Sequence, residues 1–153
     1  MGDTHVRYEV GGWGVGEMWL AGNRLLHHEL PRAMGDGPGS SHPLARRVVE
    51  YFGGRPDDFL DVELDLDGAT EFERALTEAL RRVPRGRTVT YGELAGLAGR
   101  PNAQRAAGTF CARNRFGLVV PCHRVVGAGG IGSYGSLGVG YKRRLLELEG
   151  VSI

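Results

Sequence analysis

The hydrophobic period of the sequence changes near residue 70, and this change limits the folds that the chain can adopt. Before it, apolar and polar residues alternate, as over residues 6–10, which is typical of half-buried strands. After it, apolar residues recur every three or four positions, as over residues 71–82, which is typical of helices packed on a core. The 153 residues suffice for one domain or two small ones that share a core. We therefore predict an α/β (α+β) protein in which strands come first and helices follow.

The first part of the chain predicts a small antiparallel sheet with one helix. Its expected elements are three strands, a flexible loop, a helix and a fourth strand, over residues 6–10, 18–21, 24–30, 33–42, 43–52 and 59–66. Gly22-Asn23 is a typical hairpin turn between the second and third strands. In the fourth strand the apolar side chains should face inward, at Leu60, Val62, Leu64 and Leu66. We place the domain boundary after residue 69, which makes residues 1–69 a structural domain and 70–153 the functional one.

The second part predicts helices over residues 71–82, 91–98, 102–112 and 141–149. Thr90 and Asn102 are suitable N-caps for the two central helices. Two short helices joined by a glycine-containing turn suggest a helix-turn-helix, although many such pairs never bind DNA. Small residues dominate the later of these two helices, and Arg105 projects from among them. In the last helix, Lys142, Arg143 and Arg144 should be mostly exposed.

Cys122 is the first candidate for chemistry. The apolar run over residues 118–120 predicts a short buried strand that stops at Pro121, because proline has no N–H for strand pairing. His123 and Arg124 follow at once, and either could hold a nearby thiol as thiolate. The alternative is that Cys122 is simply a small buried hydrophobe. Glu149 is expected to have a partner, with His123 a candidate, because the end of a helix disfavours a carboxylate.

Cysteine and histidine usage predicts neither disulfides nor a metal site. Cys111 and Cys122 are too few for a disulfide framework and fit no zinc spacing. Without cysteines beside them, the N-terminal histidines are expected to be packed or solvated, at His5, His27, His28 and His42. No apolar run approaches the length of a membrane span, and the first residues lack a signal-peptide core, so we expect a cytoplasmic protein.

Charge is distributed unevenly along the chain. Residues 1–70 carry six arginines against twelve acidic residues, whereas residues 71–153 carry thirteen basic residues against six acidic ones. This asymmetry favours contact between the C-terminal part and a polyanion such as nucleic acid, or it belongs to a dipolar protein that binds nothing. Seven glycines over residues 127–140 surround Tyr134. That segment is either a mobile loop or a backbone that closes over a flat ligand.

Pro121-Cys122-His123-Arg124-Val125-Val126 resembles the active-site signature of the O6-alkylguanine-DNA alkyltransferases, also called methylated-DNA–protein-cysteine methyltransferases. The resemblance extends from about residue 71 to residue 150, in the same order and nearly the same spacing. It includes residues 90–94, the Arg105 helix, Asn114, the glycine-tyrosine loop and the final Leu-Glu-Gly. The resemblance implies a ribonuclease H-like N-terminal domain and a winged-helix-like C-terminal domain with the helix-turn-helix.

The resemblance also implies a reaction. Cys122 would attack the alkyl carbon on O6 of guanine, or on O4 of thymine, in double-stranded DNA, and would keep the alkyl group after one turnover. His123 would take the thiol proton through a bound water, with Glu149 orienting the imidazole. Tyr91 would return a proton to the departing base, and Asn114 would hold the turn that carries the nucleophile. No cofactor or metal is implied, and a monomer is expected.

DNA contacts are implied residue by residue. Arg105 would fill the gap left by the flipped nucleotide, and the helix-turn-helix would approach the minor groove through Thr90, Ala103, Ala106 and Ala107. The substrate pocket would comprise Tyr91, Val125, Tyr134, Gly135 and Ser136. Here Arg115 follows Asn114 where the family often has proline, and Gly135 stands where many members have serine. Cys111 is expected to be a buried spectator.

Three other classes of function compete with repair. A damage sensor would bind the same lesions without chemistry, but such proteins lack the cysteine. A helix-turn-helix regulator would normally read the major groove with polar side chains, which an alanine-rich helix lacks. A cysteine hydrolase would need a base across the site and an oxyanion hole.

Overall fold

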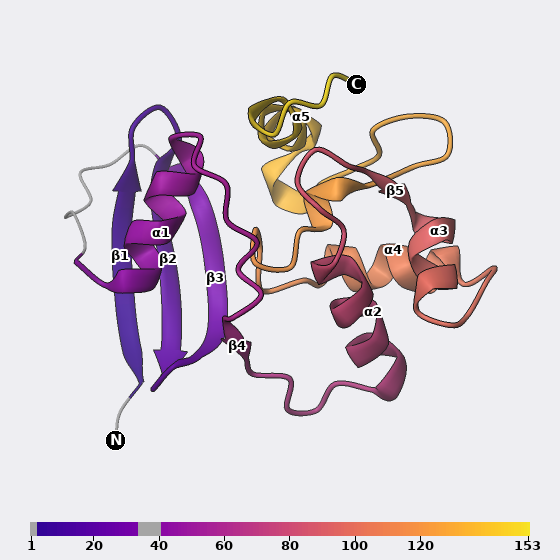
Figure 1. The fold of residues 1–153 in the computed structure, drawn as a ribbon, viewed down its shortest axis with the longest axis horizontal. Helices are drawn as coiled ribbons and strands as arrows, with labels where there is room; N and C mark the ends of the chain where they lie inside the picture. The colour runs from indigo at the N-terminus through magenta and orange to yellow at the C-terminus, as the bar shows by residue number, and fades with distance from the viewer. Residues whose placement is uncertain (1–2, 34–40) are drawn as a thin grey trace. The chain divides into compact units, whose positions relative to one another are not determined.

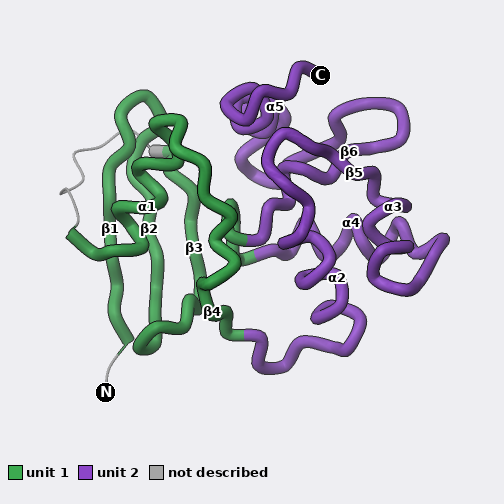
Figure 2. The backbone as a smooth tube through the Cα atoms, viewed as in Figure 1, with its two compact units in different colours: residues 1–65, 115–119 green, residues 66–114, 120–153 purple. Residues whose placement is uncertain are grey.

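The computed structural model describes residues 3–33 and 41–153, so that most of the loop expected over residues 33–42 lies outside the described part. The chain forms two compact units (Figure 2). The first unit comprises residues 1–65 and 115–119, and the second comprises residues 66–114 and 120–153. Within the described residues the fold is mixed α/β, with a four-stranded sheet and five α-helices. None of the helices in this part of the chain is long and apolar enough to cross a membrane.

The sheet of the first unit confirms the predicted meander (Figure 1). Its strands lie in the order β1 (Thr4–Val10), β2 (Gly14–Ala21), β3 (Arg24–Ala33) and β4 (Glu63–Leu64). The first three strands are antiparallel, and β4 is parallel to β3. Tyr8 pairs with Gly16, where a Cβ atom would lie 2.3 Å from the tyrosine ring, so only glycine leaves room for this buried ring.

Helix α1 (Pro43–Phe52) has the predicted bounds and packs against the sheet. Pro43 suits the first helical position because it has no N–H to leave unsatisfied. His42 caps the helix, since its Nδ1 accepts a hydrogen bond from the Leu44 N–H at 3.2 Å. The helix buries one apolar stripe, made of Leu44, Ala45, Val48, Tyr51 and Phe52.

The strand predicted over residues 59–66 is wrong except at β4. Phe59 has φ of +52° and a buried side chain, whereas the side chain of Leu60 is exposed. Asp57 Oδ1 accepts from the Phe59 N–H at 2.9 Å, and Asp58 Oδ1 accepts from the Leu60 N–H at 3.0 Å. These aspartates offer the backbone a turn in place of strand pairing.

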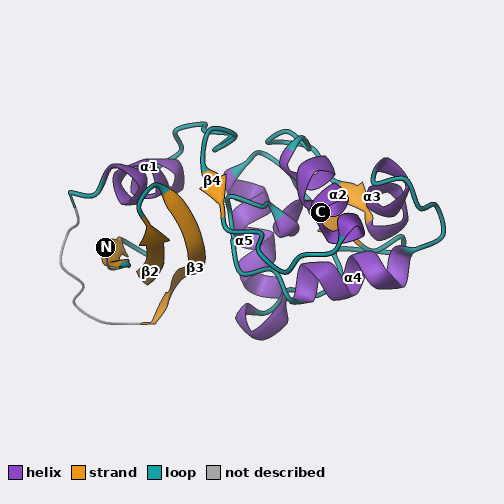
Figure 3. Ribbon diagram, turned by 90° about the horizontal axis from the view of Figure 1, so that it is seen from below, coloured by secondary structure: helices purple, strands orange, loops and turns teal. Residues whose placement is uncertain are grey.

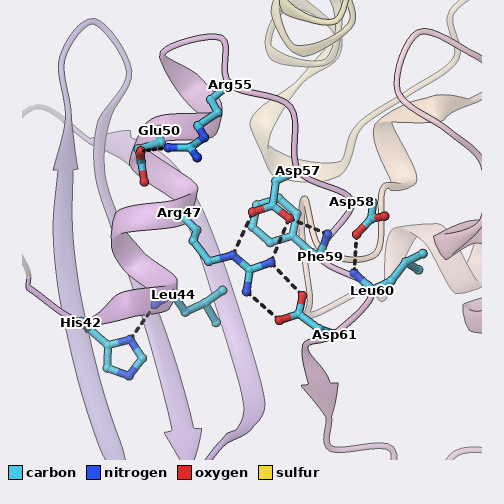
Figure 4. Close-up of polar contacts among 10 residues, drawn as sticks. All are labelled: His42, Leu44, Arg47, Glu50, Arg55, Asp57, Asp58, Phe59, Leu60 and Asp61. Carbon is cyan, nitrogen blue, oxygen red and sulfur yellow. Dashed lines mark hydrogen bonds and ion pairs between the residues drawn. The ribbon is translucent and has the colours of Figure 1, made fainter.

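Arg47 fixes this turn against α1 (Figure 4). Its guanidinium donates to Asp57 at 2.8 and 2.9 Å and to Asp61 at 2.8 and 3.0 Å. The same group lies 5.2 Å from the centroid of the Phe59 ring. These bonds lower the pKa of Asp57. Bidentate bonds of this kind add geometric specificity to an ion pair.

His28 of β3 connects the sheet to a distant part of the sequence. Its N–H donates to the Arg115 carbonyl at 2.8 Å, and its Nδ1 donates to the Gly117 carbonyl at 2.7 Å. Because a carbonyl only accepts, Nε2 is the unprotonated nitrogen, and it accepts from the Tyr8 hydroxyl. A Cβ atom on Gly117 would lie 3.0 Å from Leu30, so the segment packs closely. Burial lowers the pKa of His28 to about 4.

Acid should therefore destabilise the first unit through His28. Its folded pKa of about 4 lies below its ordinary value of 6.5, so the unfolded chain binds more protons between these values. Stability should fall as pH decreases through this window, by about 3 kcal/mol in total. The fluorescence of Trp13 and Trp19, the only two tryptophans, reports on this unit during urea unfolding. His28→Gln should flatten the pH dependence, and an equally steep dependence in that variant would contradict the assignment.

The second unit is mostly helical (Figure 3). Its α-helices are α2 (Glu71–Arg81), α3 (Tyr91–Leu97), α4 (Gln104–Ala112) and α5 (Val139–Leu148). Short strands β5 (Val89–Thr90) and β6 (Val125–Val126) form a parallel pair. Two turns of 3-10 helix cover Cys122–Arg124 and Gly135–Leu137.

Capping confirms two of the predicted helix starts and corrects a third. Thr70 and Thr90 each form a capping box with the glutamate three residues later. Asn102 does not cap α4: its φ is +74°, and Ala103 occupies the N-cap position without a side-chain bond. Asparagine tolerates the left-handed conformation, so here it makes the turn between α3 and α4.

Candidate active site

A tight turn presents Cys122. The predicted strand over residues 118–120 is wrong, because these residues are buried but form turns, with φ of +72° at Leu118. Pro121 has φ of −81° and ψ of 68°, and the Cys122 N–H donates across it to the Val120 carbonyl at 2.8 Å. This is an inverse γ-turn. The apolar run predicted the burial of these residues correctly. Strand pairing also needs backbone carbonyls that are free to accept, and here side chains donate to the carbonyls of Gly117 and Val120.

Asn114 holds the turn and the thiol together, as expected. Its Nδ2 donates to the Val120 carbonyl at 2.9 Å and to Cys122 Sγ at 3.0 Å. Cys122 is buried, and burial raises the pKa of its thiol well above the ordinary value. The neighbouring thiol of Cys111 raises this pKa further, whereas Asn114 and Lys142 lower it. The resting sulfur is therefore protonated and needs a base before it can act as a nucleophile.

The predicted partnership of His123 and Glu149 is present in the structure. His123 is fully buried, and its Nε2 lies 2.8 Å from Glu149 Oε2. No group in the described part of the chain bonds to His123 Nδ1. Burial and the nearby Arg124 charge lower the pKa of His123, so the imidazole is neutral. With Nε2–H donating to the carboxylate, the lone pair of Nδ1 is available as a base.

Arg124 is the second partner of Glu149. Its Nε and Nη2 donate to the two carboxylate oxygens at 2.9 and 2.8 Å, and its Nη1 donates to the Val83 carbonyl at 2.8 Å. Burial raises the pKa of Glu149 to about 8, and these charge-assisted bonds oppose that shift by favouring the carboxylate. The positive charge of Arg124 therefore balances the negative charge of the Glu149 carboxylate and does not stabilise the Cys122 sulfur.

The prediction that Lys142 would be mostly exposed is wrong, because its side chain is fully buried. Its Nζ donates to the Val125 carbonyl at 2.6 Å and to the Ser133 carbonyl at 3.1 Å. Sequence reasoning missed this residue, although composition carried a signal. Lys142 is the only lysine beside eighteen arginines, which indicates a position where arginine does not substitute.

The predicted pocket residues differ in burial. Val125 is fully buried, Tyr91 and Tyr134 are half-buried, and Gly135 and Ser136 are exposed. Burial raises the pKa values of Tyr91 and Tyr134, and the thiols of Cys111 and Cys122 raise them further. Both phenol groups therefore lie near both thiols. Cys111 is half-buried and close to the nucleophile, so it is neither fully buried nor remote from the site.

The predicted DNA-binding residues do not all share one surface. Arg105 and Ala106 of α4 are exposed, and Ala103 is half-buried. Ala107 is fully buried, which places it on the core side of the helix and corrects its assignment to the DNA-facing set. Thr90 is half-buried, and its hydroxyl accepts from the Glu93 N–H at 3.0 Å.

Comparisons with known proteins show the family to which the chain belongs. A family model for the DNA binding domain of 6-O-methylguanine DNA methyltransferase matches residues 71–151. Methylated-DNA–protein-cysteine methyltransferases of Mycobacterium bovis and Methanosarcina acetivorans are 44% and 45% identical, over 73% and 69% of this chain and 67% of each relative. The crystal structure of Mycobacterium tuberculosis OGT in complex with DNA has a TM-score of 0.80 and 33% identity, covering 95% of this chain and 92% of that one. The chain therefore belongs to the 6-O-methylguanine DNA methyltransferase family.

Proposed function

We propose that this protein repairs O6-alkylguanine, and O4-alkylthymine, in double-stranded DNA by moving the alkyl group to its own Cys122. The observation that carries the proposal is the buried Cys122 thiol, held by Asn114 and followed by the His123–Glu149 pair. These residues all lie within the stretch that matches the family model. The names of the relatives, as methylated-DNA–protein-cysteine methyltransferases, support the same reaction.

The reaction begins with proton transfer from the Cys122 thiol, through water, to His123 Nδ1. Glu149 accepts from Nε2–H and stabilises the imidazolium that forms. The thiolate then forms a bond to the alkyl carbon while the bond from that carbon to guanine O6 breaks, and the electron pair leaves with the base. Tyr91 donates a proton to the departing guanine, and its phenolate then regains a proton from solvent while the imidazolium of His123 loses one to solvent. The thioether product is stable, so each molecule acts once.

The target base must leave the duplex to reach a buried sulfur. We assign this step to α3 and α4, with Arg105 taking the place of the flipped nucleotide and Ala106 allowing close approach to the minor groove. Arg105 is exposed on α4, which supports the assignment. The finer fold assignments belong to the same proposal: a ribonuclease H-like supporting domain, predicted over residues 1–69, and a winged-helix-like catalytic domain, predicted over residues 70–153, acting in the cytoplasm. The first unit of the structure differs from that boundary, because it ends at residue 65 and also includes residues 115–119.

Arg105→Ala should slow methyl transfer from duplex DNA about a hundredfold, because base flipping loses about 3 kcal/mol of compensation. Transfer from the free base O6-benzylguanine should stay within about twofold, since no base is flipped. Single-turnover rates on both substrates test this. Arg113→Ala is the control: it removes the same charge from an exposed position at the end of the same helix. If both variants lost the same rate on duplex DNA, Arg105 would contribute only its positive charge and would not replace the flipped nucleotide.

Peptide mass spectrometry tests the proposed function directly. The protein is mixed with duplex DNA that contains O6-methylguanine and is digested with trypsin. Cleavage after arginine places Cys111 and Cys122 in different peptides, residues 106–113 and 116–124. One methyl group on the second peptide, saturating at one per protein, is the expected result. Binding without modification would indicate a damage sensor, and methylation of the first peptide would contradict the assigned nucleophile.

A further inference from the structure

Lys142 carries a buried charge that the residues discussed so far do not explain. It is the fourth residue of α5, where the helix dipole disfavours a cation. Burial lowers the pKa of Lys142, which is the cost of removing an ammonium group from water. Two carbonyls accept from Nζ, and the Tyr91 ring lies 5.8 Å away. These neutral partners satisfy hydrogen bonds but do not neutralise the charge.

The counter-charge of Lys142 is not a carboxylate. Across the described ranges, no aspartate or glutamate forms an ion pair with its Nζ, whereas the buried Arg124 has Glu149. The groups that raise the pKa of Lys142 are the thiols of Cys111 and Cys122. Reciprocally, Lys142 lowers the pKa of Cys122. The two buried cations therefore act on different groups: Arg124 forms an ion pair with the Glu149 carboxylate, and the charge of Lys142 acts on the thiols of Cys111 and Cys122.

We propose that Lys142 is a positioning residue for alkyl transfer, which stabilises the Cys122 thiolate and fixes the glycine-rich loop beside it, over residues 127–140. The inference rests on the proposed function and names the source of the positive charge that this function needs. When the S–H bond of Cys122 breaks, the proton passes to His123 and the electron pair stays on sulfur. Lys142 remains protonated throughout, so it supplies charge and no proton.

The same ammonium group joins two parts of the site. Val125 belongs to β6, directly after the 3-10 turn that carries Cys122, and Ser133 belongs to the glycine-rich loop. By donating to both carbonyls, Nζ holds the loop next to the strand. A Cβ atom on Gly132 would lie 3.4 Å from Nζ and 3.3 Å from the Tyr91 hydroxyl. This close packing suits a compact ammonium and leaves little room for a guanidinium.

Other titratable groups face the same sulfur and must be separated from Lys142 in any test. Cys111 of α4 raises the pKa of Cys122, and Cys122 in turn raises the pKa values of Tyr91 and Tyr134. Lys142 also lowers the pKa of His123. A readout on Cys122 alone, at each pH, distinguishes the contribution of Lys142 from theirs.

The first experiment compares Lys142→Gln, which keeps an N–H donor without charge, with Lys142→Met, which keeps neither. Iodoacetamide labelling of the Cys122 peptide is followed against pH, with circular dichroism to check the fold. Both variants should label Cys122 at least roughly tenfold more slowly at neutral pH, with the midpoint shifted upward. Arg143→Gln, on the exposed side of the same helix, should leave the midpoint unchanged. An unchanged midpoint in folded Lys142→Gln overturns the proposal.

The second experiment uses the unaltered protein, so it does not depend on how the variants fold. Because Lys142 is the only lysine, a chain labelled at the lysine ε-carbon gives one NMR signal to titrate. Carbamidomethylation of Cys122 removes the thiol that can ionise near Lys142 at alkaline pH, so this signal should titrate at lower pH after alkylation. Identical titrations before and after alkylation overturn the proposal. Neither readout uses DNA, so a failure of the repair function is recognised separately, by the absence of methyl transfer from the duplex.

Discussion

Cys122→Ala is expected to bind duplex DNA that contains O6-methylguanine and to transfer no methyl group. The reaction requires a sulfur at this position, because only the thiolate displaces the alkyl group. Asn114 keeps its bond to the Val120 carbonyl in the variant, so the turn should persist. Loss of one buried sulfur should lower the free energy of unfolding by only about 1 kcal/mol. Mass spectrometry of the protein and gel-shift binding to the lesion measure the two properties separately.

Cys111→Ser is the matched control for the nucleophile. Cys111 lies close enough to raise the pKa of Cys122, so it is the one other thiol that could accept an alkyl group. The control should transfer methyl groups with full stoichiometry. Residual transfer in Cys122→Ala that disappears when Cys111 is also replaced would move the nucleophile to Cys111.

Glu149→Ala is expected to cause the largest loss of stability, about 3–5 kcal/mol, because it leaves a buried cation without its partner. Arg124 would lose two hydrogen bonds, at 2.9 and 2.8 Å, and His123 would lose the acceptor for Nε2–H. Methyl transfer should fall by about a hundredfold or more, since the imidazole is then neither oriented nor charge-balanced. Urea unfolding gives the stability, and single-turnover transfer below the unfolding transition gives the rate.

Two further variants show whether the effect of Glu149→Ala is specific to the buried carboxylate. Glu147→Ala removes an exposed carboxylate from the same helix, and it should change stability by less than about 0.5 kcal/mol. Glu149→Gln keeps an acceptor for one donor, so its loss of stability should be smaller while its transfer rate remains low. Wild-type transfer by a folded Glu149→Gln protein would exclude a role for the carboxylate in the chemistry.

Patterns among neighbouring residues correctly predicted the strands and helices that interactions between those same residues determine. Alternation over residues 6–10 corresponds to β1, and the spacing of apolar residues over 43–52 corresponds to α1. Thr90 caps α3 through an interaction with a residue three positions away, which the sequence displays directly. The electrostatics of a helix end predicted that Glu149 has a partner, with His123 as a candidate, and the structure adds Arg124.

The predictions that are wrong concern residues whose surroundings are formed by distant parts of the chain. The buried run over residues 118–120 lacks strand pairing because side chains from elsewhere, His28 and Asn114, bond to carbonyls at its two ends. Lys142 is buried because two carbonyls from separate segments converge on its Nζ. Ala107 faces the core because of how α4 packs, and alanine suits either side of a helix. None of these partners can be read from neighbouring residues.

The return of residues 115–119 to the first unit has a consequence for synthesis on the ribosome. Chains emerge N-terminus first, and early domains usually fold before later ones are complete. Here His28 can form its hydrogen bonds to the Arg115 and Gly117 carbonyls only after residues 115–117 have been synthesised. These residues are translated after α2, α3 and α4. The first unit therefore cannot finish folding until most of the second has been made, so the two units mature together and not in succession.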